Sequence, residues 1–368
     1  MPETVDIRCA DDPRDIVHRS CQLLAEGQLL LVPTETQYTL VANGLHVAAV
    51  DRLAALSDEF GLELAVRSAD DGRDYWSNVP RTAIKLARRC WPGPVVLALK
   101  DVGGLYEQLP ESIRRHLVRP AGVHFRSSAH PLCSDLQRYL PGPLVSIADG
   151  HSTSFPRKTP ADVPTRWTDA AALILNDGPC RYGEATTVVQ IDGSRWTVLS
   201  EGVVGSRHVA RLAGEVYLFV CTGNTCRSPM AEAIFRKLLA ERLKCQPHEL
   251  EDHGYVVLSA GLAATIGAPA SREAVELLAH SGIDLSEHGS QPVTDRLLQQ
   301  ADAIYTMTRQ HRQAILASHP ELESRVRTLA EDRTDIPDPI GGSREVYEDC
   351  QRAIDRHVRA IVDQIAPE

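Results

Sequence analysis

Several features that mark other protein classes are missing from this sequence. The chain has nine cysteines, but none form a Cys-x-x-Cys pair or a Cys/His cluster at zinc spacing, so neither a zinc site nor a disulfide framework is predicted. No apolar run reaches eighteen residues, and residues 1–10 are acidic, unlike a basic, apolar signal sequence. We therefore expect a cytoplasmic protein with reduced thiols, without a membrane partner and without a metal.

Aromatic residues and positive charge are also scarce. Aromatics make up only 5% of the chain, which leaves few side chains for stacking on bases. The formal net charge is -10, so the counterion release that drives non-specific nucleic-acid binding is not expected.

The length of 368 residues predicts two domains, 1–207 and 215–368, with a short linker at 208–214. Before the linker, short apolar runs alternate with helix-like stretches, which predicts an α/β domain with a largely buried sheet. These runs lie at 29–32, 95–99, 144–148, 173–175 and 187–189.

The second domain opens with a pattern typical of a doubly wound α/β fold. Residues 216–220 form an apolar strand pattern, and apolar residues from 231 to 239 then recur at helical spacing. Further strands are predicted at 256–258 and 303–306, and helices near 272–280 and 344–365.

Between that first strand and helix lies the segment Cys221 to Pro229, in which five residues separate Cys221 from Arg227. The intervening loop is Thr222, Gly223, Asn224, Thr225 and Cys226. We expect Gly223 to permit unusual backbone angles, and Ser228 and Pro229 to be the N-cap and first residue of the helix. Free N–H groups and the helix dipole would then make the loop a phosphate cradle, with Cys221 as a thiolate beneath the phosphoryl group.

The same spacing recurs between Cys350 and Arg356, but in a helical stretch without glycine. Helical backbone amides are already hydrogen-bonded and cannot converge on an anion. This second match is therefore interpreted as ordinary helix packing or surface.

The C-terminal block resembles the low-molecular-weight cysteine phosphatases over residues 215–366. The resemblance rests on CTGNTCRSPMAEA at 221–233, on Ser259-Ala260-Gly261, on 282–288, and on DIPDP at 335–339 with the glycines at 341 and 342. It implies a phosphocysteine intermediate on Cys221, an Arg227 clamp, and thiolate stabilisation by Ser228. Asn224 and Ser259 would brace the loop, and Asp338 would be the general acid. The substrate would be a phosphorylated protein.

Substrate choice depends on two positions of this resemblance. Phosphotyrosine members of the family carry a bulky aliphatic residue where this chain has Thr225, and aromatics where it has Ile340. Thr225 resembles the protein-arginine phosphatase branch, so phosphoarginine is the preferred substrate and phosphotyrosine the alternative. Cys226 is either a small buried apolar residue or a thiol that forms a reversible disulfide with Cys221. Arsenate reductase chemistry would need further cysteines, and residues 246–349 contain none.

The N-terminal block, around residues 13–204, resembles the threonylcarbamoyl-AMP synthase (YrdC-like) family, which implies a twisted mixed sheet and a pocket for ATP and threonine. The residues that correspond to this pocket are Thr34, Thr36, Tyr38, Arg126, Thr186 and Thr187. Several family positions differ: Glu35 replaces an aspartate, residues 56–60 carry no cation, Asp149 replaces an asparagine, and Glu201 stands where an arginine is expected. Repulsion of a triphosphate by Asp58 and Glu59 predicts that synthase activity is lost or much altered.

Two alternatives stay open for this block. It is a binding or regulatory module, for which Arg114, Arg115, Arg119 and Arg126 could form a basic patch, although a solvated face is the commoner outcome. Otherwise the protein is bifunctional and retains a role in tRNA modification. A binding protein with two idle sites is disfavoured by the intact Cys221, Arg227 and Asp338 set.

Overall fold

The computed structural model describes residues 2–9, 12–57, 61–77, 80–100, 102–148, 156–193, 195–330, 332 and 334–365. The chain divides into two compact units, Met1–Leu212 and Ala213–Glu368. Most of the segment 208–214, expected as a linker, lies in helix α8 (Ser206–Ala213). Two contacts explain this helix: Val209 is fully buried, and Arg89 Nη1 donates to the Leu212 carbonyl at 2.7 Å.

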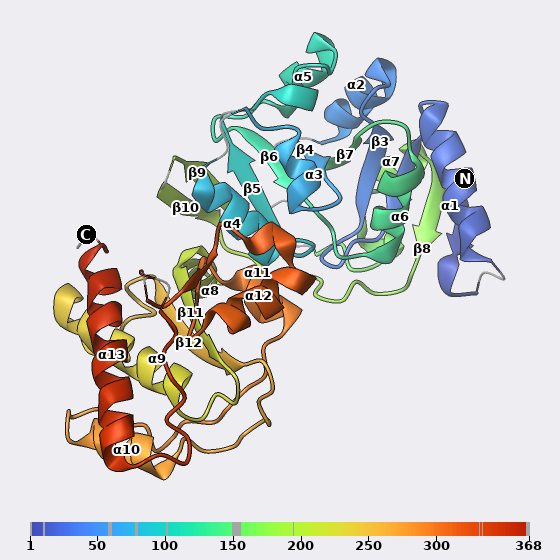
Figure 1. Cartoon of the computed structure of the whole chain (residues 1–368). Coiled ribbons are helices and arrows are strands. Elements are labelled where there is room, and N and C mark those ends of the chain that lie inside the picture. The colour runs from blue at the N-terminus through green and yellow to red at the C-terminus, as the bar shows by residue number, and fades with distance from the viewer. Residues whose placement is uncertain are drawn as a thin grey trace. The chain divides into compact units, whose positions relative to one another are not determined.

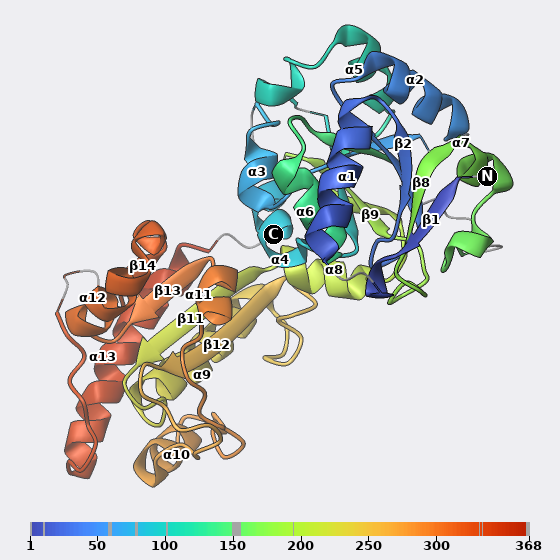
Figure 2. The ribbon, with the colours of Figure 1, turned by 90° about the vertical axis from the view of Figure 1, so that its right-hand side faces the viewer.

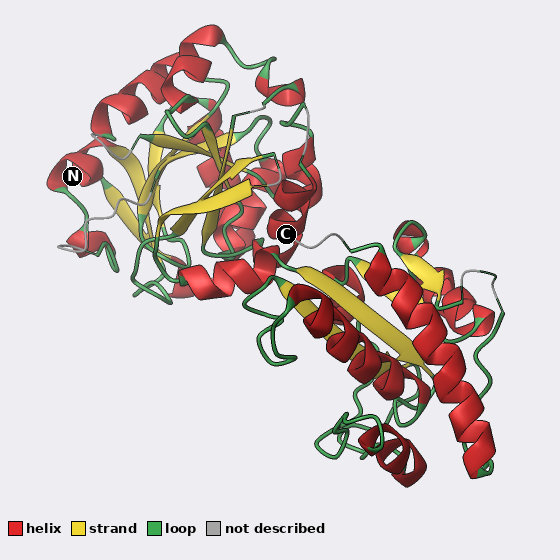
Figure 3. Ribbon diagram, turned by 90° about the vertical axis from the view of Figure 1, so that its left-hand side faces the viewer, coloured by secondary structure: helices red, strands yellow, loops and turns green. Residues whose placement is uncertain are grey.

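The N-terminal unit is built on one mixed sheet, as predicted, with the described strands in the order β1-β8-β2-β3-β7-β4-β6-β5-β9-β10. Figure 3 shows these strands in yellow among the helices of the unit. The strands are β1 (Glu3–Asp6), β2 (Leu29–Val32), β3 (Thr39–Asn43), β4 (Leu62–Ala65), β5 (Val95–Leu99), β6 (Val123–Arg126), β7 (Leu144–Ile147), β8 (Ala171–Asn176), β9 (Thr187–Asp192) and β10 (Arg195–Ser200). The helices before α8 are α1 (Pro13–Ala25), α2 (Val47–Leu56), α3 (Ala69–Arg73), α4 (Arg81–Cys90), α5 (Glu111–Leu117), α6 (Pro131–Tyr139) and α7 (Thr165–Ala170).

All five apolar runs of the N-terminal half form strands, and each of these strands lies between two others in the sheet: β2, β5, β7, β8 and β9. The central strands are buried on both faces, so their sequences are continuously apolar rather than alternating. Strands β4 and β6 carry charged residues, Glu63 and Arg126, at fully buried positions. These charges obscure the strand pattern in the sequence.

The C-terminal unit is a parallel sheet in the order β12-β11-β13-β14, covered by helices (Figures 1 and 2). Its strands are β11 (Glu215–Cys221), β12 (Tyr255–Gly261), β13 (Ala303–Thr306) and β14 (Val326–Thr328). Its helices are α9 (Arg227–Leu243), α10 (Arg272–Ala279), α11 (Asp295–Gln300), α12 (Arg309–Ser318) and α13 (Arg344–Asp363). The predicted doubly wound parallel fold is confirmed.

Strand β11 separates the two halves of this core. Val216, Leu218 and Val220 pack in a cluster with residues of α11 and α12, whereas Phe219 and Cys221 pack with α9, α10 and α13. Successive side chains of a strand point to opposite faces, so Cys221 ends the strand on the α9 side. None of the described helices is long and apolar enough to span a bilayer.

Candidate active site

The phosphate-cradle loop predicted from the sequence lies between β11 and α9. Helix α9 begins at Arg227 with Cys226 as its N-cap, so the expectation that Ser228 caps the helix is wrong. Ser228 instead lies in the first turn, where its side chain is fully buried and faces Cys221.

The left-handed residue of the loop is Asn224 rather than Gly223. Asn224 has a φ of 55°, whereas Gly223 does not have a positive φ. Asparagine tolerates this conformation better than most residues, and its side chain is held in place here. The glycine that the loop requires is Gly261 on β12, since a Cβ there would lie 2.5 Å from the Thr222 carbonyl oxygen.

Two donors converge on the sulfur of Cys221. The Asn224 backbone N–H donates to Sγ at 3.2 Å, and Ser228 Oγ lies 3.0 Å from Sγ. Ser228 Oγ also accepts a hydrogen bond from Asn224 Nδ2 at 3.0 Å, and its own proton can go to Cys221 Sγ or to the Ala260 carbonyl oxygen 3.4 Å away. Cys221 is 2% exposed, so these donors can stabilise a thiolate in a site with little water.

The Asn224 side chain is braced on all sides. Its amide also donates to Ser259 Oγ at 2.9 Å, and its Oδ1 accepts from the Gln291 backbone N–H at 2.9 Å. His288 Nε2 lies 2.8 Å from the Asn224 carbonyl oxygen. The structure therefore brings Asn224 and Ser259 together, as the resemblance implies.

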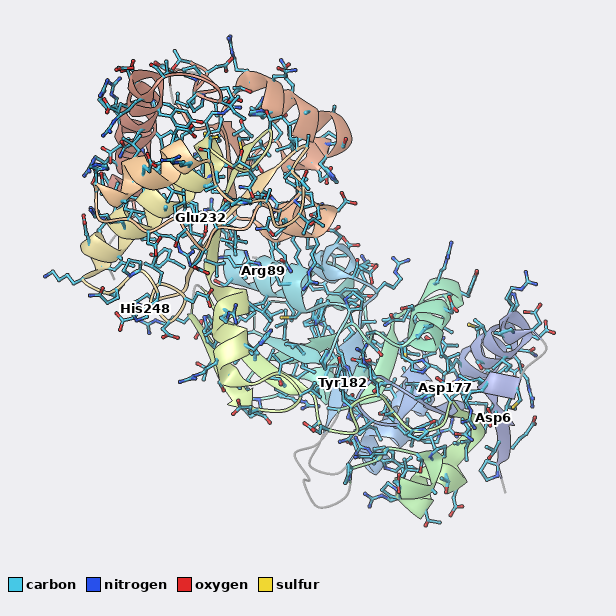
Figure 4. All side chains as sticks on the ribbon, turned by 90° about the horizontal axis from the view of Figure 1, so that it is seen from below. Asp6, Arg89, Asp177, Tyr182, Glu232 and His248 are labelled. Carbon is cyan, nitrogen blue, oxygen red and sulfur yellow. The ribbon has the colours of Figure 1, made fainter. Side chains whose placement is uncertain are left out.

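The network continues beyond the loop to a carboxylate. Ser259 Oγ donates to Glu232 Oε2 at 2.6 Å, and Glu232, labelled in Figure 4, comes from the second turn of α9. Burial raises the pKa of Glu232, although Ser259 and Arg236 partly oppose this effect. Sequence reasoning assigned no role to Glu232, His288 or Gln291.

Arg227 and Asp338 form an ion pair at the mouth of the loop. Arg227 is 5% exposed and also donates through Nη1 to the Ile336 carbonyl at 3.2 Å, whereas the Asp338 side chain is 43% exposed. Both partners of the Arg227 guanidinium, Ile336 and Asp338, thus belong to the same segment before α13. A bound phosphoryl group would compete with Asp338 for Arg227, leaving the carboxyl free for proton transfer.

The remaining predicted residues surround the loop at different depths. Thr225 is half-buried, and its carbonyl accepts from the Ser271 N–H at 2.8 Å. Cys226 is buried, with its sulfur 3.6 Å from the Tyr347 hydroxyl. Ile340 is 67% exposed. Thr222 contacts His311, which was not predicted, with 2.9 Å between Oγ1 and Nε2.

The second cysteine–arginine match, Cys350 and Arg356, is interpreted from the sequence as ordinary helix packing or surface. Cys350 is a buried residue of helix α13, in agreement with that interpretation. Its thiol donates to the Pro337 carbonyl at 3.7 Å, so it packs behind the segment that carries Asp338. All nine cysteines are free thiols. Within the described ranges, no three His, Cys, Asp or Glu side chains are grouped closely enough to bind a metal ion.

In the N-terminal unit, Arg126 joins the residues predicted around it. Its Nη2 donates to Thr36 Oγ1 at 2.5 Å and to Thr34 Oγ1 and Glu35 Oε1 at 3.2 Å each. Its Nη1 lies 3.5 Å from Glu63 Oε1. All of these side chains are at least 95% buried.

The other predicted N-terminal residues are Tyr38, Thr186 and Thr187, and the hydroxyls of Tyr38 and Thr187 bond backbone groups elsewhere in the unit. The Tyr38 hydroxyl donates to the Gly178 carbonyl at 2.8 Å and accepts from the Asp177 N–H at 2.9 Å. Thr187 Oγ1 donates to the Val204 carbonyl at 2.7 Å, and the Thr186 hydroxyl is buried without a hydrogen-bond partner among the described residues.

The possible basic patch does not form as one surface. Arg126 is buried, and Arg119 is held by the Leu62 carbonyl at 2.8 Å and by His124. Arg115 pairs with Asp51. Asp58, Glu59 and Asp149, which entered the argument about ATP, lie outside the described residues.

Comparison with known proteins agrees with the C-terminal geometry. Residues 216–368 match the family model of the low molecular weight phosphotyrosine protein phosphatases. A probable low molecular weight protein-tyrosine-phosphatase EpsP from Ralstonia nicotianae is 40% identical over 149 residues, which cover 40% of this chain and 94% of that protein. The chain belongs to the low molecular weight phosphotyrosine protein phosphatase family.

Both substrate classes occur among the relatives of this phosphatase chain. A protein-arginine-phosphatase from Bacillus subtilis is also 40% identical, over 152 residues that cover 40% of this chain and 95% of that protein. The solved structure of the YwlE arginine phosphatase from Geobacillus stearothermophilus shows 32% identity, covers 41% of this chain and 92% of its own, and has a TM-score of 0.36. Residues 22–202 match the Sua5/YciO/YrdC family model, described as telomere recombination.

The residues around Arg126 do not fit the ATP that the N-terminal resemblance implies. Burial opposes the ionisation of Glu35, but Arg126 and the Ser128 hydroxyl outweigh it, and the pKa of Glu35 is lowered. Arg126 therefore faces two carboxyl groups, Glu35 and Glu63, which offset its charge and make it a poor partner for a phosphate. The cavity lined by Thr34, Glu63 and Arg126 has a volume of about 20 Å³, the size of a single water molecule.

Proposed function

We propose that this member of the phosphatase family dephosphorylates proteins through a phosphocysteine intermediate on Cys221, and that phosphoarginine is its preferred substrate. The observation that carries the proposal is the convergence of the Asn224 N–H and the Ser228 hydroxyl on Cys221 Sγ, with Arg227 and Asp338 beside them. No metal or other cofactor is part of this proposal.

The reaction takes place in two displacements. The Cys221 thiolate attacks phosphorus, the S–P bond forms, and the bond to the leaving nitrogen or oxygen breaks as Asp338 supplies its proton. Water then attacks the phosphocysteine, Asp338 accepts a proton from that water, and phosphate leaves as the thiolate returns. Arg227 binds two of the phosphoryl oxygens throughout, and Ser228 stabilises the departing sulfur.

The preference for phosphoarginine is supported by Thr225 and Ile340. Ile340 supplies no aromatic surface, so a phenyl ring would lose a stacking contribution of about 0.5–1.5 kcal/mol. The Thr225 hydroxyl makes a long contact of 3.7 Å with Cys226 Sγ, which leaves it able to bond a guanidino nitrogen instead. An aliphatic residue at this position could only pack.

Hydrolysis of a phosphoarginine-bearing and a phosphotyrosine-bearing protein tests the proposal. Wild type should prefer phosphoarginine, Thr225→Ile should shift the preference toward phosphotyrosine, and Cys221→Ser should abolish both activities. Thr225→Val is the matched control, because it keeps the branched shape and removes only the hydroxyl. A wild-type preference for phosphotyrosine would reject the arginine assignment, and turnover that survives Cys221→Ser would reject the mechanism.

The second candidate, threonylcarbamoyl-AMP synthesis by the N-terminal unit, is not favoured by any contact described above. We propose instead that this unit does not use ATP or threonine. Melting the full chain with and without both compounds tests this point, since a ligand at 100 times its Kd stabilises by about 2.7 kcal/mol. A clear upward shift, or conversion of ATP to AMP, would contradict it.

A further inference from the structure

His311 is a buried residue that the proposed mechanism does not use, although it contacts the phosphate loop. It lies in the first turn of α12, where its backbone N–H donates to the Thr308 hydroxyl at 3.2 Å. Strand β13 pairs with β11 in parallel register, Val220 opposite Thr306, so the segment after β13 returns beside the loop that follows β11. His311 Nε2 thereby lies 2.9 Å from Oγ1 of Thr222, the residue next to the nucleophile.

The environment of the ring fixes its protonation. His311 is 7% exposed, and its Nδ1 is buried without a hydrogen-bond partner among the described residues. A proton on Nδ1 would be a buried donor with no acceptor, so the neutral tautomer with the proton on Nε2 is favoured. Burial and the nearby Arg227 both lower the pKa of His311 and oppose the cation, although Asp338 and Asp335 act in the other direction.

Thr222 is otherwise held only from the side of β12 in the contacts that the structure describes. The Thr222 carbonyl accepts from the Ala263 N–H at 2.9 Å, and the Cys221 carbonyl accepts from the Leu262 N–H at 3.0 Å. These bonds fix the edge of the loop that faces β12. The bond to His311 fixes the opposite edge, through a side chain.

We propose that His311 is a positioning residue that holds Thr222, and through it the backbone of the phosphate loop, in the conformation that binds a phosphoryl group. The inference rests on the proposed phosphatase function. Loop amides must point at the same anion for the cradle to work, and without His311 the backbone at Thr222 would keep only its bonds to the segment after β12. The contribution is made by a neutral hydrogen bond and not by a charge.

A double-mutant cycle tests the proposal in the full chain. Thr222→Val and His311→Leu each remove one partner of the bond, and we expect each to lower kcat/KM for a small aryl phosphate about three- to tenfold, the equivalent of one hydrogen bond. The inhibition constant of inorganic phosphate should rise in parallel. The double variant should be no worse than the more damaged single variant, because the bond can be lost only once. Losses that simply multiply, or single variants with wild-type kinetics, would overturn the proposal.

Conservative variants separate positioning from folding. His311→Gln keeps an N–H donor and Thr222→Ser keeps the hydroxyl, so both should stay within about twofold of wild type. If either conservative variant lost as much as His311→Leu with an unchanged melting temperature, the hydrogen bond would not be the cause.

Two different measurements distinguish a failure of the His311 proposal from a failure of the proposed phosphatase function. Absence of Cys221-dependent turnover in wild type would refute phosphatase function alone. The stabilisation of the four proteins of the cycle by inorganic phosphate would still measure whether His311 and Thr222 act together.

Discussion

Replacing Ser228 by alanine is the perturbation whose consequence follows most directly from the geometry of the nucleophile. The Ser228 hydroxyl is 3.0 Å from Cys221 Sγ and 3.4 Å from the Ala260 carbonyl oxygen, so a Cys221 thiolate is both its nearer and its charged acceptor. A hydrogen bond to a charged group contributes about 1.5–3 kcal/mol, and each 1.4 kcal/mol corresponds to about a factor of ten in rate. We therefore expect Ser228→Ala to lower kcat about ten- to hundredfold.

The loss should fall mainly on the breakdown of the phosphocysteine, because the sulfur must leave as a thiolate in that step. Stopped-flow hydrolysis of an aryl phosphate should show a burst of phenol followed by slow turnover. Thr294→Ala is the matched control: it removes a hydroxyl that caps α11 by accepting from the Leu297 N–H, and it should leave kcat unchanged. A Ser228→Ala protein with wild-type kcat, or one in which only KM rises, would refute the assigned role of the hydroxyl.

The remaining predictions concern the buried charges of the N-terminal unit and the second thiol of the loop. Arg126→Leu leaves Glu35 and Glu63 buried without their cation, which should destabilise that unit by about 3–5 kcal/mol in thermal or urea unfolding. The pKa of Glu35 is lowered in the folded protein, so the ionised Glu35 stabilises the fold at pH values above its unfolded pKa, and this stabilisation is lost as the pH falls through its folded pKa. The difference in free energy of unfolding between wild type and Arg126→Leu should therefore become smaller in acid. A difference that does not depend on pH would argue against the ion pair. One equivalent of peroxide should oxidise the Cys221 and Cys226 thiols of wild type to a disulfide, with release of water, and added thiol should restore activity. Excess peroxide should carry Cys221 of Cys226→Ser on to the sulfinic acid, so less activity should return with thiol. A peroxide-treated wild type without the Cys221–Cys226 disulfide by peptide mass would exclude this pairing.

The sequence was most informative where function depends on residues close together in the chain. The loop from Cys221 to Arg227 lies between an apolar strand and a periodic helix, so its position could be predicted from local patterns alone. The conformation inside the loop could not, because Gly223 and Asn224 both tolerate left-handed angles and only tertiary contacts decide between them.

Residues that support the loop from a distance were missed for a different reason. His288 and His311 lie 64 and 89 residues from their partners in the loop, and their contacts depend on how the strands are ordered in the sheet. Neither His288, in the loop before α11, nor His311, in the first turn of α12, carries a signal of that order in a single sequence.

In the N-terminal pocket, the sequence shows which family residues are replaced, but it does not show which other side chains lie beside them. The missing cations and the glutamate at position 35 were visible in the sequence and predicted the loss of ATP binding. The second carboxylate, Glu63, was not, because it reaches Arg126 from a different strand, where it lies opposite Ser146 in the register between β4 and β7.

The covalent state of Cys221 during turnover tests the central claim most directly. Asp338→Asn should slow the attack of water on the intermediate, so this variant, mixed with an aryl phosphate and rapidly quenched, should carry one phosphoryl group on the peptide that contains Cys221. The same treatment of Cys221→Ala with Asp338→Asn should leave this peptide without a phosphoryl group. Turnover by wild type without any phosphorylated Cys221, or with the phosphoryl group on another residue, would contradict the account.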